Sequence, residues 1–340
     1  MYFWLVEPWI AGDIDIRVGA DSDRYWDAAK SASSGESWSL VTWTGNFFGP
    51  VLLAVILKNG FAVMCFNFLL FGIALAVAAC IRGVRVETFG FLMLLNAELF
   101  PALTTLNKEI FGLLAAVLTA KFVYSGSKSK LLIFAAFVMS VLGRWEQAAI
   151  LLVFLIFYYC RPFRGHPRIA ILTLVGGLTV IYPLLFSVFG IDPTIFDYLV
   201  EGAHTIVKLN AIQAAYGFPL VLIPKIFMLL AGTLASPWFY WSGEFLRVGF
   251  EDIQQTIFQP LGCLAILLLM AFWIIRGRFK LGQPIALLIA ITLIVGAVAP
   301  FIQPRYVYPA YVLLCLEIAR TNTTSLRSSD FRLRNSHRAV

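Results

Sequence analysis

The sequence is poor in charge and lacks the signatures of common soluble enzymes. Only 13% of its 340 residues are Asp, Glu, Lys or Arg, against about 25% in an average soluble domain. It contains no Walker phosphate loop, no GxSxG, no HExxH and no cysteine pair at zinc spacing. We therefore do not expect this chain to use ATP directly or to carry out the chemistry of those motifs.

Cysteine is also scarce. The five cysteines, which all lie in or at the ends of apolar runs, are Cys65, Cys80, Cys160, Cys263 and Cys315. A cysteine in such a place behaves as a small core residue. We expect neither disulfides nor metal ligands among them.

Apolar residues dominate the composition instead. They make up 60% of the chain, against roughly 45–50% in soluble domains, and the mean hydropathy is +0.84. The 30 phenylalanines and 9 tryptophans suit lipid-facing and interfacial positions. We predict an all-α fold, a polytopic integral membrane helical bundle with about 9–10 spans of roughly 20 residues each.

The apolar runs divide the chain into four parts. Residues 1–10 resemble the remnant of a first helix, and residues 11–46 form an acidic outer loop. Residues 47–319 form the transmembrane bundle, which includes a second outer loop over residues 190–256. Residues 320–340 are rich in Ser, Asn and Arg and are expected to be a disordered basic cytoplasmic tail.

The net charge of +7 is explained by cytoplasmic loops rather than by nucleic-acid binding. The basic clusters are Arg82 and Arg85, Lys128 and Lys130, Arg161 to Arg168, Arg276 to Lys280, and the tail. All of them fall inside the cell if the short runs 47–57 and 218–235 are interfacial or re-entrant helices on the outer side. An arrangement with two extra crossings would instead place Arg82 and Arg276 on opposite sides.

The most polar patch in the first third of the chain is Gly19-Ala20-Asp21-Ser22-Asp23-Arg24-Tyr25-Trp26. With Asp13 and Asp15 it brings four carboxylates into one loop. Such a loop against an apolar bundle favours proton chemistry or a cation site at the membrane boundary. The alternative is a solvated loop that only joins two spans.

Charged residues interrupt the apolar runs at three further places. They are Lys108-Glu109, Arg144 with Glu146, and Arg305 beside Tyr306. Charge at membrane depth is costly, so these residues should face a cavity or one another. The alternatives are a hairpin turn with an ion pair and, for Arg305, an interfacial anchor. His204, alone in the second polar loop, is more often a surface residue than a catalytic one.

Several of these stretches resemble membrane glycosyltransferases of the C superfamily, which use polyprenyl-phosphate-linked sugars, and related bacterial polysaccharide-assembly proteins. The residues that carry the resemblance are Gly19-Ala20-Asp21-Ser22 with Tyr25 and Ala29, Phe48-Gly49-Pro50, Phe66-Asn67, Asn107-Lys108-Glu109, Leu142-Gly143-Arg144 and Pro304-Arg305-Tyr306. Here the acidic motif is Asp-Ser-Asp rather than two adjacent acids.

The resemblance implies transfer of a sugar from a polyprenyl-phosphate carrier to a glycan or lipid-linked acceptor, at the outer face of a bacterial inner membrane. It implies Asp21 as the base, with Asp23 as the alternate, and cations that hold the departing phosphate. The expected substrate-binding residues are Tyr25, Trp26, Lys108, Glu109, Arg144, Glu146, His204, Arg305 and Tyr306. Tyr25 and Trp26 would stack on a sugar face.

No protein-bound metal site is predicted, although a divalent cation could accompany the donor. Two other functions fit parts of the pattern. One is an O-antigen-type polymerase, which joins lipid-linked repeats. The other is a transporter or flippase of lipid-linked sugar, which would need polar residues right across the bundle. The nearly apolar inner half of the spans favours an enzyme with a site on one side.

Overall fold

A computed structural model describes residues 20–33, 47–126, 129–163, 165–189, 204–231, 259–299 and 304–320. Over these ranges the chain is all-helical, which confirms the predicted fold class at this coarse level. The α-helices are α2 (Ala20–Ser33), α4 (Phe48–Leu57), α5 (Gly60–Ala79), α6 (Val86–Leu94), α7 (Leu99–Thr104), α8 (Glu109–Tyr124), α9 (Lys130–Gly143), α10 (Trp145–Tyr159), α11 (Pro167–Phe189), α12 (His204–Tyr216), α13 (Phe218–Ala231), α16 (Gln259–Ile275), α17 (Pro284–Val298) and α18 (Tyr308–Ala319). A short 3₁₀ helix, η6 (Pro304–Val307), precedes α18.

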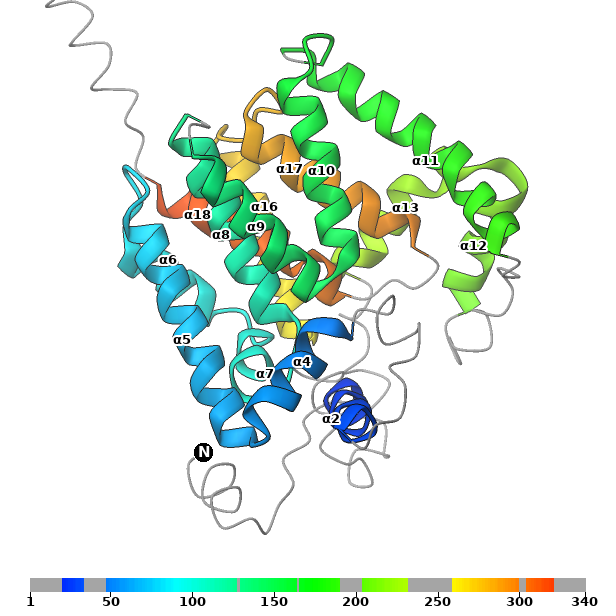
Figure 1. The fold of residues 1–340 in the computed structure, drawn as a ribbon. Coiled ribbons are helices and arrows are strands. Elements are labelled where there is room, and N and C mark those ends of the chain that lie inside the picture. Colours follow the sequence, from blue (N-terminus) through cyan, green and yellow to red (C-terminus); the bar gives the residue numbers. More distant parts are fainter. Residues whose placement is uncertain are drawn as a thin grey trace, which may run out of the picture.

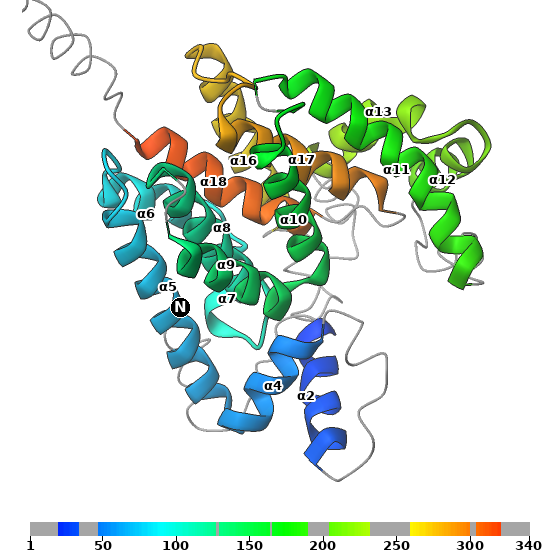
Figure 2. The same ribbon diagram turned by 45° about the horizontal axis from the view of Figure 1, so that its top comes forward.

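The centre of the bundle is α8. Fourteen of its sixteen residues are buried, as expected for a helix that is apolar all round. Helices α5, α9 and α18 pack around it, and Figure 1 shows α8 among them. On the other side of α18 lies α17, against which α10, α11 and α13 also pack (Figure 2).

Two close contacts fix the beginning of α8. The buried Asn67 side chain of α5 donates a hydrogen bond to the carbonyl oxygen of Thr105, 2.8 Å away, in the turn before α8. A methyl group built on Gly49 of α4 would lie 2.0 Å from the carbonyl oxygen of Leu142 in α9. Only glycine allows this approach. The contacts bring α4, and α2 packed on it, to the end of the bundle where α8 begins (Figures 1 and 2).

The two ends of α8 have different surroundings, about 24 Å apart by helix geometry. At the far end the Tyr124 hydroxyl donates to the Glu317 carboxylate of α18. The Arg320 guanidinium lies over the Tyr124 ring at 4.1 Å, and the backbone N–H of Arg85 donates to the last turn of α18. Arg85, in the turn after α5, and Arg320, after α18, thus lie at the end of α8 opposite Glu109.

The predicted number of membrane spans is not confirmed. Within the described ranges one helix, α5, is long and apolar enough to cross a membrane by length and composition, and seven other apolar helices have only 10–17 residues. Polar turns such as those at Asn96, Thr105 and Arg144 divide the apolar runs into short helices. Only 28% of the apolar window of α5 is buried, so most of this helix faces outward.

Two segments that the sequence suggested as loops contain helices. In the acidic segment, Ser22, Tyr25 and Ala29 are buried and their spacing is that of one helix face, which explains why α2 forms and packs on α4. In the second segment, α12 packs on α13. The short runs expected to be interfacial do form helices, α4 and α13. The predicted remnant helix at 1–10 and the tail beyond residue 320 lie outside the described residues.

Candidate functional site

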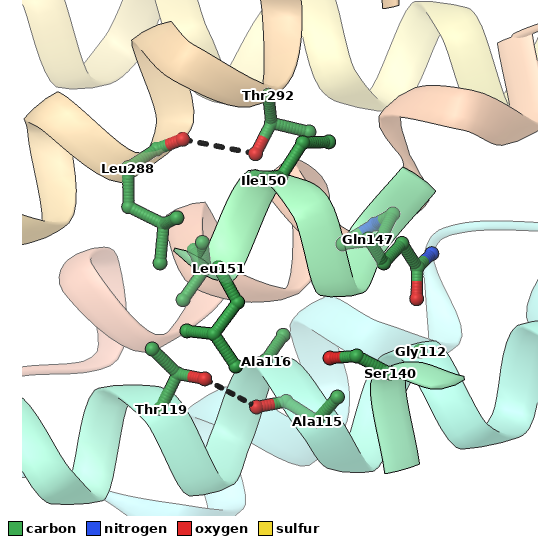
Figure 3. A pocket seen from close by; sticks show the side chains of 12 residues that line it. Gly112, Ala115, Ala116, Thr119, Ser140, Gln147, Ile150, Leu151, Leu288 and Thr292 are labelled. Carbon is green, nitrogen blue, oxygen red and sulfur yellow. Dashed lines mark hydrogen bonds between the residues drawn. The ribbon is translucent and has the colours of Figure 1, made fainter. Parts of the chain in front are cut away.

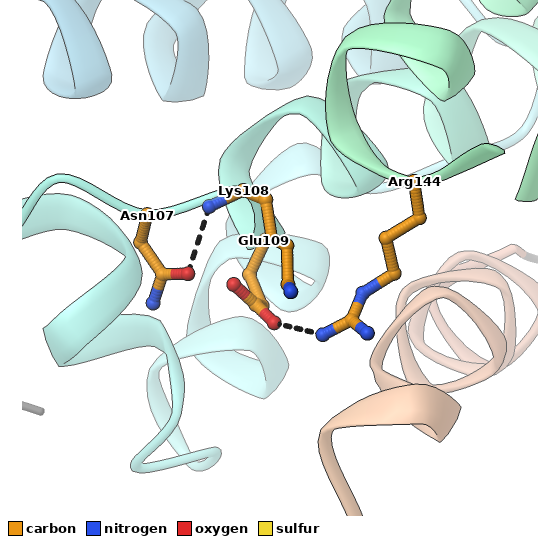
Figure 4. Close-up of polar contacts among 4 residues, drawn as sticks. All are labelled: Asn107, Lys108, Glu109 and Arg144. Atoms are coloured by element: carbon orange, nitrogen blue, oxygen red, sulfur yellow. Dashed lines mark hydrogen bonds and ion pairs between the residues drawn. The ribbon is translucent and has the colours of Figure 1, made fainter. Parts of the chain in front are cut away.

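Three turns converge at the beginning of α8. Lys108 and Glu109 start that helix, Arg144 links α9 to α10, and η6 brings Arg305 and Tyr306 from the far part of the sequence. Arg144 has an extended backbone (φ −152°, ψ 129°), which breaks the apolar run into two helices and turns its side chain toward Glu109 (Figure 4). We call Lys108, Glu109, Arg144, Arg305 and Tyr306 the cation cluster.

A buried ion pair is the centre of the cation cluster. Nη2 of Arg144 donates to Oε1 of Glu109 over 2.5 Å, and the side chains are only 5% and 3% exposed. Figure 4 shows the two groups pointing at one another, with the Lys108 ammonium beside them. The second carboxylate oxygen of Glu109 is buried and has no hydrogen-bond partner among the described residues. A buried pair such as this one needs further compensation to be stable.

Neighbouring cations supply that compensation. Burial alone would raise the pKa of Glu109, but the charges of Arg144, Arg305 and Lys108 outweigh it and lower this pKa below its usual value. Glu109 is therefore ionised at neutral pH. A second buried carboxylate, Glu98, lines the same water-sized cavity as Arg305. Three cations, Lys108, Arg144 and Arg305, therefore lie near the carboxylates of Glu98 and Glu109, and Glu146 follows Arg144 by two residues.

Aromatic rings hold two of the cations. The Arg144 guanidinium lies 4.7 Å from the centre of the Tyr306 ring, and the Lys108 ammonium lies 5.8 Å from that of Tyr25. Tyr25 is only 1% exposed, and its ring meets Phe47 edge-on at 5.0 Å. This burial contradicts the expectation that Tyr25 stacks on a sugar. The residue instead fastens α2 to Lys108, and the partly buried Trp26 packs against the same core.

The structure gathers most but not all of the predicted site residues. Glu146 lies in the first turn of α10, half-buried, beside the cluster in sequence. His204 begins α12 away from these turns, and its side chain lies outside the described residues. Asp21 and Asp23 lie in the first turn of α2, again without described side chains. Position 21 precedes Tyr25 by about one helical turn, whereas position 23 lies on the opposite side of the helix.

Sequence reasoning missed two residues that support the site. Asn67 anchors the turn before α8, and Glu98 is buried next to the cluster. Both interrupt apolar runs, and a polar residue in an apolar run is the signal that could have identified them.

A cavity of ≈ 40 Å³ lies further along α8, lined by residues of that helix from Gly112 to Thr119 and by side chains of neighbouring helices (Figure 3). The hydroxyls of Thr119 and Thr292, which line it, donate to carbonyl oxygens of their own helices. The Gln147 amide covers Gly112, where a methyl group would lie 2.7 Å from the amide oxygen. This volume suits one or two waters and is about a tenth of an ordinary ligand pocket.

The ion pair gives the first prediction. Arg144→Met leaves the Glu109 carboxylate buried without its nearest partner, which should lower the free energy of unfolding by about 3–5 kcal/mol. Arg144→Met combined with Glu109→Gln should be more stable than Arg144→Met alone, because no unpaired charge is buried. Denaturant unfolding of the purified protein measures both. The exposed Arg276→Met serves as control; equal stability of Arg144→Met and this control would contradict the role of the pair.

No family model, curated protein or solved structure matches this chain. Its activity must therefore be inferred from the residues of the site. Within the described ranges, no three His, Cys, Asp or Glu residues lie close enough together to hold a metal ion. The chemistry on which an inference can be built is thus that of cations and carboxylates: anion binding by the cation cluster beside the acidic first turn of α2.

Proposed function

We propose that this chain is an integral membrane glycosyltransferase that moves a sugar from a polyprenyl-phosphate-linked donor to a glycan or lipid-linked acceptor. The observation that supports it best is the cation cluster, which gathers Lys108, Arg144 and Arg305 at one end of an apolar bundle. A phosphate ester is an anion that such a cluster can stabilise, both in the bound donor and as it leaves.

The apolar surface supports a lipid environment for this reaction. Many large apolar side chains are exposed, far more than a water-soluble surface usually carries. The most exposed, which come from six different helices, are Ile275, Leu131, Tyr216, Ile223, Leu172 and Leu94. A lipid chain on the donor would share that environment and reach the cluster from the membrane side.

The chemical step assigns roles to the charges. The acceptor hydroxyl attacks the anomeric carbon while a carboxylate takes its proton, and the phosphate leaves with the electron pair of the broken C–O bond. Arg305, which is half-buried, is the most accessible cation of the cluster for that phosphate. Arg144 and Lys108 are buried. Glu109 is a poor base because it is bound to Arg144 and its pKa is lowered.

The base is therefore sought on α2. Asp21 is the better candidate, because its position lies about one turn before Tyr25, whose ring is in contact with Lys108. Position 23 is on the other side of the helix. Asp23 remains the alternate in our proposal, since it could orient the acceptor or share a cation with Asp21.

The proposed arrangement in the membrane predicts that α2 and the turn after α16 lie on opposite sides of the bilayer. Lys30 is on α2, whereas Arg278 of that turn interacts electrostatically with Glu317 at the far end of α8. In a variant without the five native cysteines, Lys30→Cys and Arg276→Cys should react with a membrane-impermeant maleimide from opposite sides. Reaction of both from the same side would reject the arrangement.

Removal of one accessible cation should weaken donor binding. Arg305→Gln should lower the affinity for polyprenyl phosphate roughly ten- to hundredfold, the usual cost of one charge-assisted contact. A modest fall in its melting temperature is expected, because Arg305 is half-buried and also contributes to the compensation of the Glu109 charge. Arg276→Gln, at the opposite end, is the control and should bind normally. Native mass spectrometry measures binding, and equal affinity in both variants would remove Arg305 from the phosphate site.

Asp21→Asn should reduce sugar transfer by roughly 10²–10⁴, because an amide cannot accept the proton. The matched control is Asp27→Asn on the same helix, where the aspartate is exposed and paired only with Lys30 at 3.7 Å. Transfer is followed as glycoconjugate assembly in cells without the native copy, at equal protein level. Loss of sugar transfer in Asp23→Asn but not in Asp21→Asn would assign the role of base to Asp23. Full activity in both variants and in the double variant would reject α2 as the catalytic element and favour a transporter.

A further inference from the structure

A second buried charge lies outside the cation cluster. Lys225 of α13 is 0% exposed. Its ammonium donates hydrogen bonds to Oε1 of Gln213 at 2.6 Å, Oδ1 of Asn210 at 2.8 Å and the carbonyl oxygen of Ala299 at 3.3 Å. Gln213 also donates from its amide nitrogen to the carbonyl oxygen of Val298. The lysine thus joins three helices, α12, α13 and the end of α17.

None of these partners is charged. A buried ammonium without a carboxylate is costly, so its retention in an apolar helix calls for a physical reason. The carbonyls of Val298 and Ala299 end α17, where the helix dipole is negative and attracts a cation. Three acceptors match the three hydrogens of the ammonium. Lys225 therefore has no donor left for an anion, and the arrangement is a clamp rather than a second anion site.

The clamped turn of α17 leads to the cation cluster. A methyl group built on Gly296, in that turn, would lie 4.0 Å from Cβ of Tyr306. Tyr306 in turn carries the Arg144 guanidinium over its ring. Helices α13 and α17 both pack directly on η6. The contacts therefore run without a break from Lys225 through the end of α17 to Tyr306 and Arg144.

We propose that Lys225 is a positioning residue for the cation cluster: by clamping the end of α17 to α12 and α13, it fixes η6 and so the placement of Arg305 and Tyr306. The effect of Lys225 on η6 follows from the contacts of α12, α13 and α17 alone. The consequence for donor binding rests on the proposed function.

The charge of the clamp changes near the pH of the cell. Burial lowers the pKa of Lys225 to about 8 from 10.5. Among the described residues its ammonium donates hydrogen bonds to the neutral groups named above, and α16 and α17 carry no charged residue. The charged residues on the other elements around α13 are Arg168, Lys208 and Arg305, none of which is a partner of the ammonium.

The sign of the pH effect follows from this shift. Between about pH 8 and 10.5 the unfolded chain holds a proton on Lys225 that the folded chain has lost, so the stability of the fold rises with pH there. The neutral amine, however, has one hydrogen fewer, and the longest bond, to Ala299, should be lost first. Between about pH 8 and 10.5 the clamp should therefore loosen while the titration of Lys225 raises the free energy of unfolding. A change at η6 in this pH range can therefore be distinguished from unfolding of the protein.

Hydrogen exchange tests the clamp without any assumption about function. In Lys225→Met and in Gln213→Leu, the amides of residues 305–307 and of the last turn of α17 should exchange roughly ten- to hundredfold faster, the expected effect of one lost charge-assisted bond. Exchange in α5 and α8 should not change. Lys208→Met, an exposed lysine on α12, is the control. Unchanged exchange in residues 305–307, or a rise spread evenly over the bundle, would overturn the proposal.

Donor binding at different pH tests the consequence for the site. The affinity of the wild type for polyprenyl phosphate should fall as pH rises through about 8, and Lys225→Met should bind weakly at every pH. A flat wild-type profile would overturn the role in donor binding. If exchange increases as expected but the wild type binds no polyprenyl phosphate, the proposed function fails and the clamp stands. If Lys225→Met binds polyprenyl phosphate normally and its η6 amides exchange at the wild-type rate, the clamp is rejected and the proposed function stands.

Discussion

The buried pair of Glu109 and Arg144 is the interaction on which the arrangement of this bundle depends. The two residues are 35 positions apart, and each occupies a turn between apolar helices. Neither charge is stable alone in such surroundings. The turn before α8, the turn between α9 and α10, and η6 with Arg305 must therefore meet at one place. The packing of α8 against α9 and α18 follows from that requirement.

The pair also divides the bundle into two unlike ends. At the beginning of α8, carboxylates and cations are buried among aromatic rings. At its end, Glu317 and Tyr124 lie under Arg320, and the surrounding turns are basic. In the proposed membrane arrangement, the basic far end would face the anionic inner side and the candidate site would face the outer side. The single buried helix α8 connects these two ends.

The sequence was sufficient to predict the cation cluster because the physical rule involved is strong. Lys108, Arg144 and Arg305 stand in apolar surroundings, and such charges must face one another or a cavity. The rule does not say which side chains surround these charges. The role of Asn67 was therefore not predicted, and Tyr25 was expected to stack on a sugar. Helix α12 was missed because its apolar residues are spread around the helix. Lys225 was visible as a charge in an apolar run, but its partners, amides on another helix, leave no charge pattern in the sequence.

The two buried charges are stabilised in different ways, and this difference bears on what each can do. In the cation cluster the compensation is ionic: a lowered pKa keeps Glu109 charged, and arginine does not lose its proton. The charge of the Glu109–Arg144 pair is therefore constant at all pH values in a cell. At Lys225 the compensation comes from dipoles, which hold a charge less strongly and leave a pKa of about 8. In the proposed function, the constant charge of the pair would bind a phosphate, and the charge that Lys225 can lose would adjust how firmly η6 is held.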